Sequence, residues 1–304
     1  MKTRRKRKRN IVKTVLMTLL VIVSVSVSFF CGYKYGTRQS INAPNTDELA
    51  EKAEINNTVE HSDMNLNQKY IAVVEEHVSK IDGIVQYGIH KYNDDTVYFS
   101  DTKRTPSASI IKLFIMEYAY EQITSGNVSN ESVINGESLD NLINKMITVS
   151  DNMAANKLID YFGMDKMNDF FKLKGYGDTL LERKMLDDEA VKNGKNNYTS
   201  IKDVMSFLDK VYEGKDRFPY SEMLDVMKKQ KIDTKIRKNF PSDVIIANKT
   251  GELSDVENDV GIIFGEKCDF AIAFLTQDVT NSTVARNSIS EATYELYNLL
   301  QADM

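Results

Sequence analysis

Strand-like patterns occur near both ends of the folding part of the chain, with only helical patterns between them, and this order strongly constrains the fold. Short apolar or alternating runs cover residues 84–91, 96–100, 243–249, 259–264 and 269–276. Helical spacing of apolar residues precedes the first run, over 66–81, and closes the chain near 287–301. Six helical stretches lie between the two sets of strands, at 109–124, 138–147, 152–161, 164–174, 200–213 and 221–230. The order predicts an α+β fold, in which an antiparallel sheet with flanking terminal helices adjoins an all-helical lobe.

The N-terminal segment combines a basic run with a long uncharged stretch. Seven of the chain's 39 lysine and arginine residues lie within residues 1–10, and residues 15–33 (VLMTLLVIVSVSVSFFCGY) carry no charge. As a helix this stretch is about 28 Å long, close to the hydrocarbon thickness of a bilayer. Basic residues flank only its N-terminal side. The positive-inside rule therefore predicts a cytoplasmic tail (1–13) and a single-pass transmembrane anchor (14–33) in the cell membrane.

A cleaved secretory signal is the alternative, but its apolar region is usually shorter and ends in small residues. Here the run ends in Phe29-Phe30-Cys31, which fits neither a signal-peptidase site nor a bacterial lipobox. We therefore expect an uncleaved anchor, a polar linker over residues 34–64 and an extracellular folded domain over residues 65–304. Both alternatives put the folded domain outside the cytoplasm.

The charge distribution and the cysteine count exclude several classes of function. None of the 44 acidic residues lies within residues 1–10, so the rest of the chain is more acidic than the overall net charge of −5 suggests. A nucleic-acid-binding domain instead carries basic residues on its folded part. Cys31 and Cys268 form no metal or redox motif, and no His, Cys and carboxylate set has ligand spacing. We expect no nucleic-acid partner, no metal and no cofactor.

A lysine interrupts the apolar helical stretch PSASIIKLFIMEYAY. Lys112 follows Ser109 by three residues, so both side chains lie on one helix face. Without a functional role, Ser109 is a helix cap and Lys112 is a charge that reaches solvent. A second S-x-x-K match, from Ser100 to Lys103, ends a strand in polar surroundings, so its lysine is most simply a surface charge. The pair at 109 and 112 is therefore the stronger candidate.

Two further triplets stand beside predicted elements. The triplet SDN (150–152) separates two predicted helices, and KTG (249–251) ends the apolar strand VIIAN. Without a functional role, SDN is the N-cap of the next helix and Gly251 is a strand end. Each triplet is rare by chance, and all three motifs occur in this order and in these structural settings. Together they favour a shared site over three independent structural roles.

The set S-x-x-K, SDN and KTG resembles that of the penicillin-recognising serine hydrolases, which include the class A β-lactamases. The resemblance extends over about residues 66–302. It implies a β-lactamase-like fold made of the predicted sheet, terminal helices and helical lobe. It also implies a small-molecule substrate, either a β-lactam or a cell-wall peptide.

By this resemblance, Ser109 is the nucleophile and its N–H, with that of Glu252, stabilises the oxyanion. Lys112 acts either as a neutral base, with a pKa lowered by burial, or as a cation that lowers the pKa of the hydroxyl. Ser150 relays a proton to the leaving nitrogen. The substrate-binding residues are Asn152, Lys249, Thr250, Gly251 and Glu252, and Arg286 is a further candidate for contact with a substrate carboxylate.

The resemblance fails at one position. Class A β-lactamases carry, after an arginine of their Ω-loop, a glutamate that activates the deacylating water. Aligning Arg183 with that arginine puts Met185 at the glutamate position, and a thioether cannot act as a general base. Asp187, Asp188 or Glu189 would be recruited only if the loop folds differently. We therefore expect competent acylation and impaired or rerouted deacylation.

Three functions remain open at this point. The first is a membrane-anchored serine hydrolase that attacks β-lactam amides through an acyl-Ser109 intermediate. The second is a peptidoglycan D-Ala-D-Ala peptidase or transpeptidase of the penicillin-binding-protein type, which shares the motifs. The third is a non-catalytic sensor or binding module for β-lactams or cell-wall peptides, although the basic tail is too short for a cytoplasmic output domain.

Overall fold

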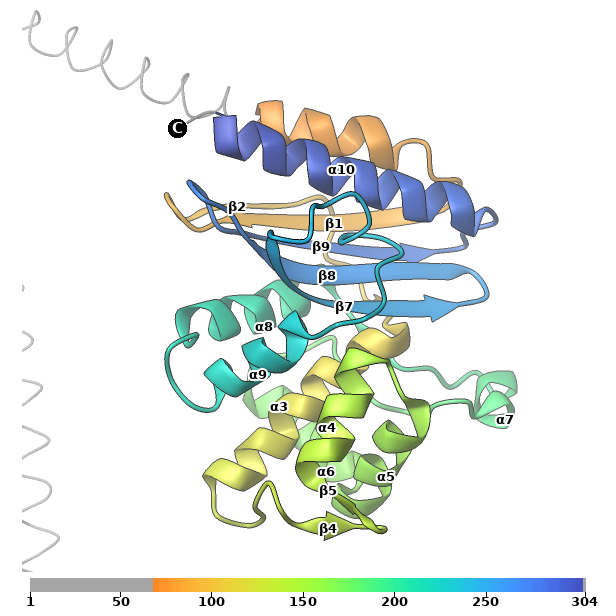
Figure 1. The fold of residues 1–304 in the computed structure, drawn as a ribbon. Coiled ribbons are helices and arrows are strands. Elements are labelled where there is room, and N and C mark those ends of the chain that lie inside the picture. The colour runs from red at the N-terminus through yellow and green to blue at the C-terminus, as the bar shows by residue number, and fades with distance from the viewer. Residues whose placement is uncertain (1–67, 303–304) are drawn as a thin grey trace, which may run out of the picture. The chain divides into compact units, whose positions relative to one another are not determined.

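The computed structural model describes residues 68–302, which contain a five-stranded antiparallel sheet (Figure 1). Its strands follow the spatial order β2-β1-β9-β8-β7, with bounds β1 (Ile84–Lys91), β2 (Thr96–Phe99), β7 (Ile245–Leu253), β8 (Val256–Phe264) and β9 (Phe270–Gln277). Strand β1 pairs with β9 along its whole length and so joins the two ends of the domain. The predicted α+β fold, with a sheet assembled from both ends, is confirmed.

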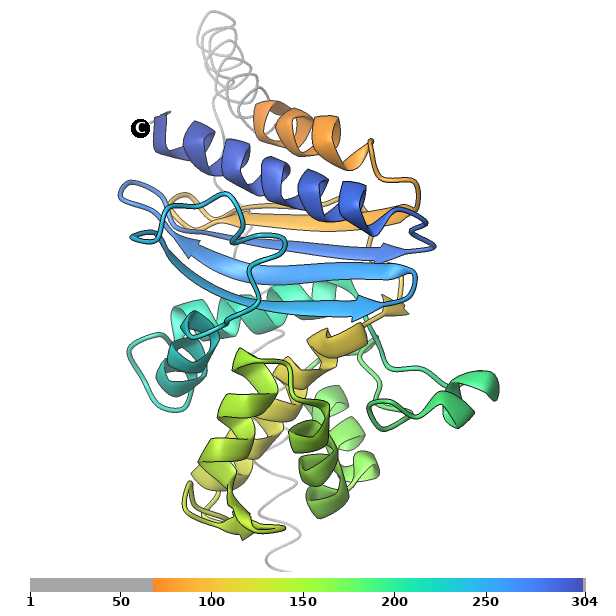
Figure 2. The same cartoon turned by 45° about the vertical axis from the view of Figure 1, so that its right-hand side comes forward.

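The two faces of the sheet are covered by different parts of the chain (Figures 1 and 2). The helix over residues 68–78 and α10 (Ser282–Ala302) lie side by side on one face, and the helical lobe lies against the other. On β9, Phe270, Ile272 and Phe274 pack with the terminal helices, whereas the alternating residues join the core of the lobe. The strand is thus buried on both faces, which accounts for its continuous apolar run.

The helical lobe is built around one central helix, α3 (Ile111–Thr124). Its first ten residues, up to Tyr120, are all buried, so α3 is enclosed on all sides rather than amphipathic. A 3₁₀ turn, η1 (Ala108–Ile110), leads into it. The remaining larger helices are α4 (Leu139–Thr148), α5 (Asn152–Phe162), α6 (Met164–Leu173), α8 (Ile201–Glu213) and α9 (Tyr220–Lys228).

The structure also contains short elements that the sequence pattern does not predict. They are β3 (Thr105–Pro106), β4 (Val133–Ile134), β5 (Glu137–Ser138), β6 (Tyr198–Thr199) and α7 (Asp188–Lys192). Each comprises two to five residues, which is too short for an apolar period to be detected. Strands β3 and β6 pair with each other and so bring the start of η1 next to the loop that precedes α8.

Several predicted boundaries are wrong, and β8 begins at Val256 instead of at residue 259. Ser109 lies in η1 instead of opening the α-helix itself. Strand β7 continues to Leu253, so the KTG triplet lies inside the strand and not at its end. The extension follows from the hairpin, since residues 250–253 pair with 256–259 of β8, a register that one strand's own sequence does not reveal. Helix α10 begins at Ser282 instead of near 287.

The predicted tail (1–13), anchor (14–33) and linker (34–64), together with the predicted start of the domain at residue 65, lie outside the described residues. Within residues 68–302, no helix has the length and apolar character needed to cross a membrane. In the same range, no group of three or more His, Cys, Asp or Glu side chains has an arrangement that could hold a metal ion.

Candidate active site

Ser109 is held where the helical lobe meets the edge strand of the sheet. It is half-buried in η1, between the buried residues Ala108 and Ile110. Asn258 of β8 fixes the preceding segment, because its Nδ2 donates to Pro106 O at 3.0 Å and to Ser107 O at 3.3 Å. The position of this serine is therefore set by the sheet as well as by α3.

Gly251 allows strand β7 to pass close to the backbone of η1. A Cβ on Gly251 would lie 3.1 Å from Ser109 N and 3.1 Å from Ser107 O, closer than most real contacts of a Cβ atom. The glycine is therefore required by the close approach of two backbones and not by a positive φ. The same strand carries Lys249 two residues earlier, so β7 connects the surroundings of Ser109 with those of Lys249.

Lys112 is fully buried, and its amine contacts the SDN triplet. Nζ donates to Ser150 O at 2.7 Å, to Asn152 Oδ1 at 2.7 Å and to Ser150 Oγ at 3.2 Å. Within the described residues, Ser109 Oγ makes no hydrogen bond, with Lys112 or with any other group. Burial lowers the pKa of Lys112 to about 7, although the charge of Asp151 opposes this shift. The neutral amine is thus accessible near neutral pH.

The SDN triplet joins α4 to α5 and holds a strained backbone. Ser150 has a φ of +57°, in the left-handed region that non-glycine residues rarely adopt. Asp151 is the N-cap of α5, and its side chain accepts a hydrogen bond from Ala154 N at 2.9 Å. The N-cap predicted from the sequence therefore coexists with the contacts that Ser150 and Asn152 make to Lys112.

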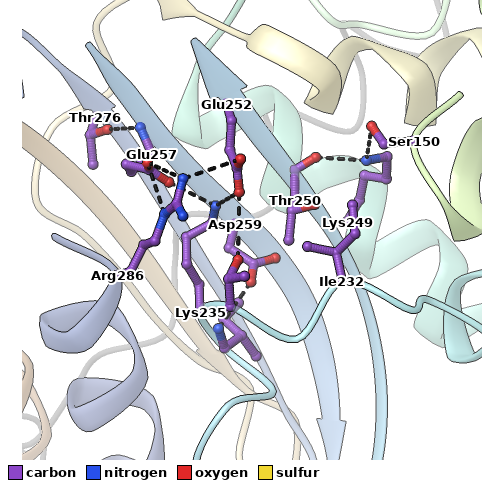
Figure 3. A network of polar contacts seen from close by, with 12 residues as sticks. Ser150, Ile232, Lys235, Lys249, Thr250, Glu252, Glu257, Asp259, Thr276 and Arg286 are labelled. Atoms are coloured by element: carbon purple, nitrogen blue, oxygen red, sulfur yellow. Dashed lines mark hydrogen bonds and ion pairs between the residues drawn. The ribbon is translucent and has the colours of Figure 1, made fainter. Parts of the chain in front are cut away.

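Lys249 approaches the same serine from the sheet. Its buried Nζ donates to Ser150 Oγ at 2.9 Å and to Thr250 O at 2.7 Å, as Figure 3 shows. Burial lowers the pKa of Lys249 well below its usual value, and the charge of Lys112 lowers it further. Two amines from different lobes thus share the hydroxyl of Ser150, which gives that oxygen both a proton source and a proton acceptor.

Beyond the KTG triplet, two like charges face each other across the β7–β8 hairpin. Glu252 and Glu257 are direct partners in the antiparallel register, an arrangement that is unfavourable without cations. Lys235 Nζ lies 2.7 Å from Glu252 Oε1 and 2.9 Å from Glu257 Oε2. Arg286 Nη2, from α10, lies 2.8 Å from Glu257 Oε1 and 3.2 Å from Glu252 Oε2 (Figure 3). We call these four residues the carboxylate clamp.

Sequence reasoning identified only part of this clamp. It named Glu252 for its backbone N–H and Arg286 as a contact for a substrate carboxylate, whereas both side chains are engaged with residues of the chain itself. Lys235 and Glu257 belong to no motif and were missed. The one available signal was the pair of glutamates on adjoining strand patterns, which demands nearby cations once the hairpin register is known.

Met185 lies in the loop that runs from residue 177 to β6. Its main chain is fixed to α5, because Met185 N donates to Asn156 Oδ1 at 2.8 Å and Asn156 Nδ2 donates to Met185 O at 3.0 Å. Its side chain is 7% exposed and belongs to the core of the helical lobe. The methionine therefore fills a packed, apolar position in the loop, beside the helix that begins at the SDN triplet.

The acidic residues that follow Met185 are directed elsewhere. Asp187 Oδ1 accepts a hydrogen bond from Ala190 N at 2.9 Å and so caps α7. Asp188 and Glu189 are exposed on α7, which stands away from the rest of the lobe in both views (Figures 1 and 2). Asn197 closes the base of the loop, since its Oδ1 accepts from the backbone N–H of Glu182 and of Arg183.

Comparisons with known proteins agree with this fold. The sequence profile of the beta-lactamase enzyme family matches residues 68–300. A beta-lactamase from Sphaerobacter thermophilus is similar in structure, with 23% identity, a TM-score of 0.67 and alignment over 76% of this chain and 96% of that one. A beta-lactamase from Chitinophaga pinensis has 17% identity and a TM-score of 0.70, with alignment over 76% of this chain and 99% of that one. PBP-A has 21% identity and a TM-score of 0.67, with alignment over 78% of this chain and 96% of that one.

A variant of PBP-A, also similar to this chain, forms an acyl-enzyme complex with penicillin G. No curated protein matches the chain. The matched profile spans nearly all of the described residues, and the two beta-lactamase structures align over 96% and 99% of their own length. The chain therefore belongs to the beta-lactamase enzyme family.

Proposed function

We propose that this protein is a serine hydrolase that attacks β-lactam amides through an acyl-Ser109 intermediate and releases the acyl group slowly. The observation that carries the proposal is the sharing of Ser150 Oγ by two buried amines, Lys112 at 3.2 Å and Lys249 at 2.9 Å. A hydroxyl held between two buried amines whose pKa values are lowered can pass a proton in either direction. A purely structural site gains nothing from burying two cations beside each other.

Acylation would begin with attack of Ser109 Oγ on the lactam carbonyl carbon. The hydroxyl proton passes to the neutral amine of Lys112, and the carbonyl oxygen gains the negative charge. Backbone N–H groups of Ser109 and Glu252, on facing backbones of η1 and β7, stabilise that charge. Collapse of the tetrahedral adduct breaks the carbon–nitrogen bond, and Ser150 delivers a proton to the leaving nitrogen.

Substrate binding would involve the remaining motif residues. Asn152, already bound to the amine of Lys112, orients the substrate amide, and Thr250 lies on the edge strand along which the substrate backbone aligns. Gly251 keeps this edge open where β7 approaches η1. Lys249 donates a hydrogen bond to Ser150 Oγ and can pass it a proton.

Deacylation would be slow because the loop offers no base to activate water. Met185 is packed in the core, Asp187 caps α7, and both Asp188 and Glu189 are exposed on a helix that stands apart. Loss of a general base typically slows the step that it serves by about 10²–10⁴-fold. The acyl-enzyme would therefore accumulate.

The same arrangement favours a second candidate, a D-Ala-D-Ala peptidase or transpeptidase of the cell wall. The observation that favours it is that the loop has no base to activate water. Such an enzyme uses the Ser109 chemistry on a peptide and is trapped as an adduct by penicillins. The similarity to PBP-A, whose variant carries penicillin G as an acyl-enzyme, is compatible with this alternative. In either case we propose that residues 14–33 anchor the domain outside the cell membrane.

The test is incubation of the full-length protein with penicillin G, with intact mass and free lactam followed over time. A persistent adduct of one penicillin supports the proposal, and cleavage of a D-Ala-D-Ala peptide then separates the peptidase from the slow lactamase. An adduct without any turnover of lactam or peptide identifies a sensor, and rapid turnover contradicts slow deacylation.

Two serine variants serve as matched controls. Ser109→Ala abolishes the adduct, whereas Ser100→Ala, at the other S-x-x-K match, retains it. An adduct on Ser109→Ala, or the absence of both adduct and turnover in the wild type, would end the assignment of lactam chemistry to this serine.

A further inference from the structure

The edge of the site beyond Thr250 already contains a carboxylate of the chain itself. Side chains two residues apart on a strand project to the same face, so Thr250 and Glu252 share one side of β7. A substrate carboxylate bound at Thr250 would lie next to that of Glu252. The side chain of Glu252 is 40% exposed, so its charge is directed toward the open edge rather than removed into the core.

The two cations of the carboxylate clamp are already neutralised, and in the adjoining cavity the positive charge of Lys238 is matched by the negative charge of Asp233. Lys235 bridges Glu252 and Glu257, and Arg286 contacts the same two carboxylates. The carboxylate clamp therefore has two positive and two negative charges and offers no net attraction to an anion. Although partial burial raises the pKa of Glu252, hydrogen bonding and the charges of Lys235 and Arg286 outweigh it and lower the pKa below its usual value. Glu252 thus stays ionised at neutral pH.

A cavity continues from the clamp along α10. It has a volume of about 340 Å³ and is lined by Asp233, Thr234, Lys238, Thr283, Arg286 and Asn287. Thr234 Oγ1 also lies 3.5 Å from Glu252 Oε1, so the cavity and the clamp adjoin. A substrate whose leaving group continues past Thr250 would find space there, whereas one that ends in a free carboxylate would meet Glu252.

We propose that the side chain of Glu252 determines specificity within this substrate class: it favours substrates whose leaving group is uncharged at this point and continues as an amide or ester over those, such as penicillins and D-Ala-D-Ala peptides, that end there in a free carboxylate. The inference rests on the proposed function of Ser109, because it concerns the substrate class of that same reaction. Like charges brought together at a binding site disfavour the wrong partner, and a half-exposed charge does so to a degree that salt reduces.

The experiment compares acylation of the full-length protein by penicillin G with acylation by its methyl ester. The two compounds differ by one methyl group, which removes the negative charge of the group that we expect beside Glu252. Glu252→Gln should raise the ratio of the acid rate to the ester rate by about tenfold. Lys235 and Arg286 keep their contacts with Glu257 in this variant, so the fold should be retained, and the melting temperature checks this.

Two controls distinguish a local effect from a general change in charge. Glu131→Gln removes an exposed negative charge of the helical lobe and should leave the ratio unchanged. Raising the ionic strength from about 0.01 M to 0.15 M shortens the screening length from about 30 Å to 8 Å and should raise the wild-type ratio, but not that of Glu252→Gln.

The outcomes separate this inference from the proposed function. If both compounds acylate Ser109 and Glu252→Gln leaves their ratio unchanged, the role of Glu252 is wrong and the function stands. A wild type that strongly prefers the free acid contradicts the inference in the same way. If neither compound forms an adduct, the proposed function fails and the inference fails with it.

Discussion

The surroundings of Ser109 and the loop that carries Met185 differ in the chemistry of the side chains that they bury. Around Ser109, the protein buries two lysines, Lys112 and Lys249, and aims both at the hydroxyl of Ser150. In the neighbouring loop it presents Met185, an apolar side chain packed in the core. Both regions are attached to the same helix, since α5 begins just after Ser150 and carries Asn156, which holds Met185. The difference therefore lies in the chemistry of the side chains and not in how the backbone is positioned.

The comparison is informative because the two arrangements differ in energetic cost. Burial of an amine without a carboxylate partner is expensive, and the protein responds by lowering the pKa of both lysines. A buried thioether carries no such penalty and gains the usual stabilisation of apolar burial. The fold thus carries electrostatic cost for the groups that would form an acyl-enzyme, and none for a group that would hydrolyse it.

The largest effect is expected from giving the loop the base that it lacks. Met185→Glu should accelerate decay of the acyl-enzyme by about 10²–10⁴-fold. A carboxylate at this position, whose main chain Asn156 holds in place, could activate water. The measurement is the loss of adduct mass after excess penicillin is removed. Met185→Gln is the matched control, since it has the same size and polarity but no basic group. Equal decay in both variants would show that the missing base does not limit deacylation.

The same glycine substitution in the two regions sharpens the comparison. Gly251→Ala would put a Cβ 3.1 Å from Ser109 N and disturb an oxyanion donor, so acylation should fall by about 10²-fold. Gly177→Ala, in the loop, has no heavy atom within 4 Å of the added Cβ and should leave acylation unchanged. Stopped-flow rates with a chromogenic β-lactam measure both. Similar losses in the two variants would contradict a special role for the approach of β7 to η1.

The sequence predicts many of the elements and motif residues in these two regions, but not the contacts between their side chains. The apolar runs predict the sheet, and the SDN triplet predicts the N-cap that Asp151 provides, because both depend on residues close in the chain. The carboxylate clamp was not predictable, since it depends on the hairpin register that pairs Glu252 with Glu257. The contact of Lys112 with Ser150 and Asn152, instead of with Ser109, likewise depends on how α3 packs beside the start of α5.

A third prediction concerns pH. If neutral Lys112 accepts the proton of Ser109, acylation should level off above its pKa of about 7 and fall toward tenfold per pH unit well below it. Decay of the acyl-enzyme should lack this dependence, because no titrating group of the loop serves that step. Single-turnover rates of the two steps between pH 5 and 9 test the difference. Acylation that is independent of pH across 7 would favour Lys112 as a permanent cation.

The titration of Lys112 should also make the stability of the protein depend on pH, in a direction that its pKa determines. Lys112 has a folded pKa of about 7, below its unfolded value of 10.5, so the unfolded chain binds more protons between these pH values. Stability should consequently rise with pH across this window as far as Lys112 is concerned. Comparing the free energies of denaturant unfolding of the wild type and Lys112→Met over pH 7–10 isolates the contribution of Lys112. A wild type that loses stability relative to Lys112→Met as pH rises would contradict the low pKa.

The smallest effects are expected from the two helix caps, one on each side of the comparison. Asp151→Ala should cost about 1 kcal/mol of global stability, because α5 is part of the buried core. Asp187→Ala removes the cap of α7, which has no buried residue, so its effect should appear in local hydrogen exchange and not in global unfolding. Only the first variant should also alter acylation: the charge of Asp151 raises the pKa of Lys112, so its removal should shift the midpoint of the pH profile to lower pH. A midpoint that moves equally in both variants would mean that Asp151 acts through the fold alone.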